Sequence, residues 1–173
     1  MKKILLSFVF LAAFLVFSLP VQAVPNQLII INKSTNQLAY FQKGKVVKTF
    51  SVATGKTKHA TPEGKFSIAN KIKNRPYYKE NIRGGDKRNP LGDRWLGLKI
   101  GRTNGTTYAI HGNNNPNSIG KYVSAGCIRM HNEEVRWLYN QISVGTPVLI
   151  LRSKQSFATI AKNNGYSKAV AAK

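Results

Sequence analysis

Cys127 is the only cysteine of the chain, and its neighbours favour covalent chemistry. It lies in the segment Ser-Ala-Gly-Cys-Ile-Arg-Met at 124–130, where Gly126 removes a side chain directly before the thiol. A thiolate is a nucleophile, whereas a buried cysteine often acts only as a small apolar group. The local pattern therefore allows two interpretations, a nucleophile presented at a strand edge or a structural cysteine.

His111 is the second candidate, because it ends a β-like segment and precedes Cys127 by 16 positions. That is enough chain for a loop that brings the two residues to neighbouring strand ends. An imidazole beside a thiol lowers the pKa of the thiol and can act as its base. The other ring nitrogen needs an acceptor, for which the carbonyl of Gly112 is the candidate. A purely structural histidine is the alternative.

A metal site fits these residues poorly. Zinc ligands usually include a closely spaced pair and number four in a structural site. His111, Cys127 and His131 include no tight pair and have no evident fourth partner. We therefore expect neither a metal nor an organic cofactor, and a single cysteine excludes an internal disulfide framework.

Short β-branched segments separated by turn residues must position the candidate residues, and they predict a mostly β domain. The segment 70–93 is polar and rich in glycine and proline, which predicts a long loop or flap. The predicted strands are 27–31, 37–41, 45–53, 65–69, 95–100, 106–110, 127–130 and 147–151.

One short helix is predicted after the cysteine, with Asn132 as its cap. Two acidic residues occupy its first turn, where the helix dipole favours negative charge. The tail at 153–173 is basic and has weak apolar periodicity, so it is either a loosely held helix or disordered. The apolar face and the glycine that follows the helix are Val135, Leu138, Ile142 and Gly145.

Residues 1–23 resemble a secretory signal peptide rather than part of the fold. Lys2 and Lys3 precede an apolar run at 4–19, and small residues suited to cleavage follow it. The run is shorter than the roughly 20 residues that a membrane-spanning helix needs, although an uncleaved anchor is the alternative. The predicted catalytic domain then covers 24–152, in an extracytoplasmic, cell-wall-associated location.

The charge is strongly positive, with 27 Lys and Arg against 6 Asp and Glu and a net charge of +21. A hydrophobic content of 42% excludes a wholly disordered basic chain. In the cytosol this charge would suggest a nucleic-acid partner, but export favours anionic cell-wall polymers and no nucleic acid. A surface that is basic without a specific partner is the alternative.

The candidate residues also carry a family resemblance. Ile-His-Gly at 110–112, followed by a loop and the segment 124–130, resembles the catalytic signature of the L,D-transpeptidases, the YkuD-type domain. Thr-Pro-Glu-Gly-Lys-Phe at 61–66, Pro-Leu-Gly at 90–92 and Arg-Trp at 94–95 resemble further stretches of that family. The resemblance favours Cys127 and His111 as catalytic residues.

The resemblance spans 26–151 and implies a β-sandwich with a short helix after the catalytic cysteine. It implies that Cys127 attacks the third residue of a peptidoglycan stem peptide and releases the terminal D-alanine. The resulting thioester passes to the amine of a neighbouring stem, which gives a 3→3 cross-link, with His111 as base. Ala125 stands where many relatives have a second histidine, so we expect altered loop packing rather than lost activity.

The family position also suggests roles for neighbouring groups. The backbone N–H groups of Gly126 and Cys127 are the expected oxyanion donors. Arg129 would support the site or meet a substrate carboxylate, with a structural role as the alternative, and Ser124 would hydrogen-bond within the loop. We further expect the basic segment 71–94 to hold substrate carboxylates and limit water access, and carbapenem-type β-lactams to acylate the cysteine.

Three other functions compete with cross-linking. An L,D-carboxypeptidase would use the same site and transfer the acyl group to water, and sequence cannot separate it from a transpeptidase. A cysteine peptidase of another fold is disfavoured, because its usual order places the cysteine before the histidine. A non-catalytic wall-binding module would keep its full function after Cys127→Ala.

Overall fold

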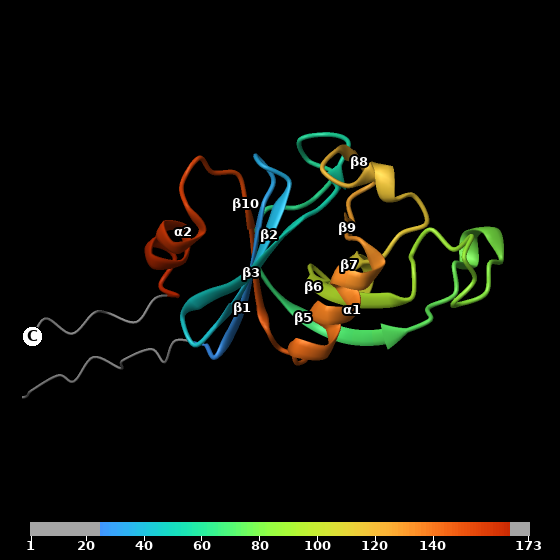
Figure 1. Ribbon diagram of the computed structural model, residues 1–173, viewed down its shortest axis with the longest axis horizontal. Coiled ribbons are helices and arrows are strands. Elements are labelled where there is room, and N and C mark those ends of the chain that lie inside the picture. Colours follow the sequence, from blue (N-terminus) through green and yellow to red (C-terminus); the bar gives the residue numbers. More distant parts are fainter. Residues whose placement is uncertain (1–24, 167–173) are drawn as a thin grey trace, which may run out of the picture.

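The computed structural model describes residues 25–166, so the predicted signal peptide lies outside the described residues. Its centre is an eight-stranded sheet in the order β3-β2-β1-β10-β5-β6-β7-β9, joined by a two-stranded sheet of β4 and β8 (Figure 1). The strands are β1 Gln27–Asn32, β2 Gln37–Gln42, β3 Lys45–Ser51, β4 Thr54–Gly55, β5 Gly64–Lys73, β6 Arg94–Ile100, β7 Thr103–His111, β8 Tyr122–Ser124, β9 Ile128–Arg129 and β10 Pro147–Leu151.

The sheet curls at β5, which belongs to both of its halves (Figure 1). The beginning of β5 pairs with β10, its remainder pairs with β6, and a register irregularity lies between Ile68 and Asn70. Such irregularities bend a strand and increase its twist. Apolar residues from both halves, such as Ile29 and Ile110, then share one buried cluster. The predicted mostly β sandwich is confirmed.

The parallel pairing of β7 with β9 positions the candidate residues. Ile110 pairs with Ile128, and His111 pairs with Arg129. Both isoleucines are fully buried in the main core. Because side chains alternate along a strand, His111 and Arg129 lie on the opposite face, and Cys127, one residue before β9, continues that face.

The predicted helix is α1, Asn132–Gln141, which packs Val135 and Leu138 into the main core. The capping role predicted for Asn132 is wrong. The residue before the helix is His131, and no side chain caps the first turn. The Asn132 side chain bonds to the backbone of Asn113 instead, because that loop lies directly beside the start of the helix.

The structure also changes the predicted boundaries around the flap. β5 continues to Lys73, so the loop covers 74–93 and contains the short helix η1, Tyr78–Glu80. The Lys71 ammonium donates to the Ile142 carbonyl at 2.6 Å and lies 4.5 Å from the Tyr139 ring centroid. Pairing with β6 therefore holds the first four residues of the predicted flap in the sheet, and Lys71 also contacts the end of α1.

The basic tail contains the helix α2, Phe157–Asn163, which Ser156 caps by accepting from the Thr159 N–H. Ile160 and Ala161 pack in a second apolar cluster on β1, β2 and β10, at the opposite end of the molecule from β6 and β7 (Figure 1). The last seven residues lie outside the described part. Among residues 25–166, no helix is both long and apolar enough to cross a membrane.

Candidate active site

The predicted site residues gather around one pocket of about 260 Å³. They come from the end of β7, the loop after β8 and the start of β9, and the flap closes the opposite side. Gly112, the residue that follows His111 in the chain, does not line the pocket itself. The residues that line the pocket are Tyr77, Pro90, Leu91, Thr107, Tyr108, His111, Ser124, Ala125, Gly126, Cys127 and Arg129.

His111 is only 3% exposed, and its Nδ1 lies 2.6 Å from the carbonyl oxygen of Gly112. Because a carbonyl can only accept, Nδ1 carries the proton, and Nε2 is the basic nitrogen of the neutral ring. Burial lowers the pKa of His111 to about 4, and the positive charges of Arg129 and Arg75 add to this effect. The backbone groups of Gly112 and Leu91 oppose the shift but do not overcome it. His111 is therefore a neutral base at physiological pH.

Trp95 holds the plane of the imidazole. It pairs with His111 across β6 and β7, and the two rings stack with centroids 5.5 Å apart and planes 14° apart. The indole N–H donates to Gly105 at 2.9 Å, and the Arg75 guanidinium lies 3.9 Å from the indole centroid. The local sequence pattern does not predict these roles, because only the strand register shows that residues 95 and 111 are partners.

Asn132 holds the backbone that orients His111. Its side chain accepts from the Asn113 N–H and donates to the Asn113 carbonyl, both at 2.9 Å. A Cβ added to Gly112 would collide with the same asparagine side chain. The close packing of Asn132 on the 112–113 backbone therefore requires glycine and places the carbonyl that fixes the histidine tautomer.

The Cys127 thiol is half-buried and donates weakly to the Thr107 carbonyl, 3.4 Å away. Within residues 25–166, no hydrogen bond joins its Sγ to the ring of His111. Burial raises the pKa of Cys127, and the Ala109 N–H and the charges of Arg129 and Arg75 only partly oppose it. The expectation that the imidazole lowers this pKa is therefore wrong, because desolvation outweighs the nearby groups.

Gly126 allows the loop to pack tightly before the nucleophile. Its φ is +148°, and an added Cβ would lie 2.5 Å from the Ala60 carbonyl oxygen and 2.8 Å from Tyr108. The Gly126 N–H donates to Ser124 Oγ at 3.0 Å, and Ser124 Oγ donates to the Cys127 carbonyl at 2.6 Å. This corrects the expectation for Gly126, because its N–H is already engaged. The Cys127 N–H has no partner within the described residues and is therefore available as a hydrogen-bond donor.

Arg129 contributes positive charge to the pocket. Its side chain makes no hydrogen bond or ion pair within residues 25–166, which leaves the structural alternative without support. It lies on the same face as Cys127 and His111 and influences the pKa of both. An unpaired guanidinium at this place can bind a carboxylate.

The flap contributes mainly apolar and aromatic surface to the pocket rather than the expected positive charge. Arg88 pairs with Asp86 at 2.7 Å, and neither Arg88 nor Lys87 lines the pocket. Arg75 is the flap cation that influences the pKa values of His111 and Cys127. The flap residues that line the pocket are Tyr77, Pro90 and Leu91.

The described residues contain no cluster of three or more His, Cys, Asp or Glu side chains that could hold a metal ion. What the pocket holds is a thiol, a neutral imidazole of defined tautomer, a free backbone N–H and a cation. These groups suit nucleophilic acyl transfer.

Comparison with known proteins agrees with this chemistry. The sequence profile of the L,D-transpeptidase catalytic domain matches residues 26–150. The chain belongs to the L,D-transpeptidase family. The putative L,D-transpeptidase YqjB of Bacillus subtilis is 53% identical over 133 residues, which cover 77% of this chain and 76% of that protein. The putative L,D-transpeptidase YkuD of the same species is 40% identical over 124 residues, which cover 72% of this chain and 65% of the relative.

Solved L,D-transpeptidases share the fold. The Mycobacterium tuberculosis L,D-transpeptidase 3 with a faropenem-derived adduct matches with a TM-score of 0.56 and 19% identity. The match covers 74% of this chain and 61% of that one. A mutant of the Enterococcus faecium L,D-transpeptidase also has a TM-score of 0.56, with 20% identity over 74% of this chain and 50% of its own. The predicted L,D-transpeptidase fold is therefore confirmed.

Proposed function

We propose that this chain is an exported peptidoglycan L,D-transpeptidase that forms 3→3 cross-links through a thioester on Cys127. The observation that carries the proposal is the pocket in which Cys127 and a neutral His111 lie on one face of β7 and β9. Residues 1–23 and the net charge of +21 support an exported protein that works on an anionic wall.

The first half-reaction begins with two neutral groups. Cys127 Sγ attacks the carbonyl carbon of the third stem residue, and His111 Nε2 takes the thiol proton during the attack. The Gly112 carbonyl stabilises the imidazolium through its bond to Nδ1, and the Cys127 N–H donates to the developing oxyanion. The C–N bond then breaks, His111 protonates the leaving nitrogen, and D-alanine departs.

The second half-reaction reverses these roles. The side-chain amine of a third residue in a neighbouring stem attacks the thioester carbonyl, and His111 accepts the proton that this amine loses. The C–S bond breaks, and the proton returns to the thiol as the new amide forms. Leu91 and Pro90 line the pocket and reduce the access of water, which would otherwise hydrolyse the thioester.

Arg129 is the proposed partner of a substrate carboxylate. Stem peptides carry free carboxylates, and Arg129 is a pocket cation without a carboxylate partner in the described residues. A bound stem peptide would bring a carboxylate to Arg129 without breaking an existing ion pair.

We also propose that carbapenem-type β-lactams inhibit the enzyme by acylating Cys127. A β-lactam carbonyl is an acyl donor, and the same thiol, base and oxyanion donor would act on it. The structure of a relative with a faropenem-derived adduct supports the proposal.

The decisive test is incubation of the purified chain with disaccharide tetrapeptide, followed by intact mass and product analysis. We expect D-alanine release, an acyl adduct on Cys127 and a cross-linked dimer, all absent from Cys127→Ala. Tripeptide without dimer would instead establish an L,D-carboxypeptidase. Absence of adduct and product under reducing conditions would contradict both, and unchanged wall binding by Cys127→Ala would then favour a binding module.

A further inference from the structure

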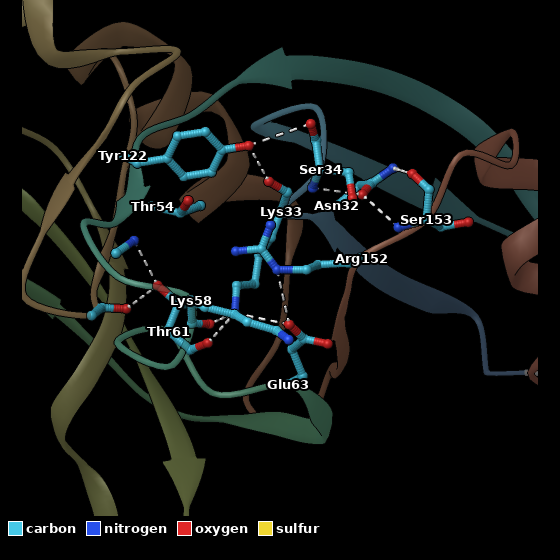
Figure 2. Close-up of polar contacts among 12 residues, drawn as sticks. Asn32, Lys33, Ser34, Thr54, Lys58, Thr61, Glu63, Tyr122, Arg152 and Ser153 are labelled. Carbon is cyan, nitrogen blue, oxygen red and sulfur yellow. Dashed lines mark hydrogen bonds and ion pairs between the residues drawn. The ribbon is translucent and has the colours of Figure 1, made fainter.

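Lys33 is a buried lysine at the end of β1, and its side chain is 1% exposed. Its ammonium donates to the carbonyls of Lys58 and Thr61 at 2.9 and 2.6 Å and to Glu63 Oε1 at 3.0 Å (Figure 2). These contacts use all three donors of the ammonium. All three acceptors belong to the turn between β4 and β5, so one rigidly placed cation holds this turn. The backbone N–H of Lys33 donates to Leu151 at 2.8 Å, which ties the lysine to the sheet.

The turn that Lys33 holds packs directly on the nucleophile loop. Thr61 is 1% exposed, and its hydroxyl accepts from the Gly55 N–H at 2.9 Å and donates to the Gly126 carbonyl at 2.8 Å. The Ala60 carbonyl leaves no room for a side chain at Gly126. A continuous set of buried hydrogen bonds therefore runs from Lys33 through Thr61 to the residue before Cys127.

The burial of this cation needs an explanation beyond stability. Replacing a buried ion pair with apolar residues is often neutral or stabilising, so a fold gains little from keeping one. Glu63 is 42% exposed and is shared with Arg152 at 3.3 Å, so Lys33 depends largely on the two carbonyls. The contacts specify the position of one turn, and that turn contacts Gly126.

We propose that Lys33 and Thr61 are positioning residues that hold the 124–127 loop so that the Cys127 thiol and N–H face the pocket. The inference rests on the proposed function only for its turnover measurement. It also gives a role to the Thr-Pro-Glu-Gly segment, which none of the catalytic steps uses. Neither residue lines the pocket that holds Cys127, so both would act through the backbone of Gly126.

Thr61→Val tests the link, because valine keeps the shape of threonine and removes only the hydroxyl. We expect kcat for D-alanine release to fall about 10- to 100-fold with KM nearly unchanged, since small misplacements of reacting groups cost this much. Thr61→Ser retains the hydroxyl and should keep kcat near the wild-type value. Thr49→Val, an exposed change on β3, is the matched control.

Iodoacetamide alkylation of Cys127 supplies a second measurement that needs no peptidoglycan. A loosened loop exposes the thiol and relieves the burial that raises its pKa, so alkylation of Thr61→Val at pH 8 should be about threefold faster or more. Thr61→Ser and Thr49→Val should react at the wild-type rate. If the wild type releases no D-alanine, the proposed function fails and alkylation alone tests the positioning role.

The inference is overturned if folded Thr61→Val matches the wild type in alkylation, or if Thr61→Ser changes as much as Thr61→Val. Thermal unfolding identifies the folded variants. If Thr61→Val does not fold, Lys33→Met provides the same comparison, with Lys45→Met on the exposed edge strand as its control. Wild-type alkylation in Lys33→Met would also overturn the proposal.

Discussion

His111 and Cys127 form a neutral pair at rest, because burial disfavours the charged form of each. A thiolate–imidazolium pair would need the thiol to lose its proton before substrate arrives. In the proposed mechanism, the thiol proton moves only when the sulfur attacks. The free thiol is therefore poorly nucleophilic, which would protect the cysteine in the oxidising compartment to which the proposed export would bring it.

The neutral pair predicts an unusual pH profile. Activity requires unprotonated His111, whose pKa is about 4, so kcat/KM should fall only as the pH drops through that region. Alkylation of Cys127 should increase only at alkaline pH, because its pKa is raised. D-alanine release and alkylation, each measured across pH, test this. A thiolate–imidazolium ion pair would be established instead if kcat/KM fell near the ordinary histidine pKa and the alkylation rate were already at its plateau at neutral pH.

The same residue links pH to stability. In the unfolded chain, His111 becomes protonated below its ordinary pKa of 6.5. In the folded chain, the same side chain becomes protonated only near pH 4. Its contribution to the free energy of unfolding is therefore lost as the pH falls through this window. Urea unfolding from pH 7 to 4 should show a smaller decline in His111→Gln than in the wild type. Equal declines would show that other groups cause the acid sensitivity.

Arg129 is predicted to act in substrate binding. Arg129→Gln should raise KM for tetrapeptide about tenfold or more, since a charge-assisted bond to a carboxylate contributes about 1.5 to 3 kcal/mol. The free energy of unfolding should change little, because the guanidinium makes no hydrogen bond within the described residues. Arg88→Gln removes an exposed ion pair outside the pocket and is the control. An unchanged KM in Arg129→Gln would contradict the role.

Two helices, α1 and α2, pack on different parts of the sheet. α1 presents Asn132 to the loop after β7 and packs its apolar face in the main core. α2 covers the outer face of β1, β2 and β10. The first helix therefore contacts the candidate site, whereas the second packs on the half of the sheet that lacks the candidate site residues.

Asn132→Ala tests the first helix. Loss of two hydrogen bonds to Asn113 should lower the free energy of unfolding by about 1 to 3 kcal/mol. The Gly112 carbonyl would also lose its support, so kcat should fall about tenfold or more. Asn140→Ala, at an exposed position of the same helix, should change neither quantity. Urea unfolding measures the free energy of unfolding, and D-alanine release measures kcat. Full activity in Asn132→Ala would exclude this positioning role.

Ile160→Ala tests the second helix. Ile160 is 1% exposed in the cluster beneath α2, so its truncation should cost about 2 to 5 kcal/mol of unfolding free energy. Among molecules that remain folded, kcat should stay at the wild-type value, because none of the residues that line the pocket belongs to this cluster. Lys162→Ala, on the exposed side of α2, serves as the control. A destabilisation no larger than that of the control would show that the tail does not contribute to folding.

The whole molecule carries a net charge of +21, and the basic residues are spread along the chain rather than grouped. Such a surface attracts anionic polymers over roughly 10 Å at 0.1 M salt. We expect binding to isolated cell walls to fall steeply as sodium chloride rises, and Cys127→Ala to bind as well as the wild type. Co-sedimentation across a salt series measures this. Salt-independent binding would point to a specific site instead of the general field.

The sequence alone determined the parts that depend on local pattern. Alternating apolar residues predicted most of the strands, and the motif around Cys127 and His111, with its family resemblance, made these residues and Arg129 the candidates. Tertiary structure decided the chemistry of the pair. The neutral state of the thiol and imidazole follows from burial by segments far away in the chain, and the stacking of Trp95 follows from strand register. The link from Lys33 through Thr61 to Gly126 joins three separate segments, and no local pattern reveals it. Desolvation and hydrogen bonding depend on which segments meet, and only the folded chain determines that.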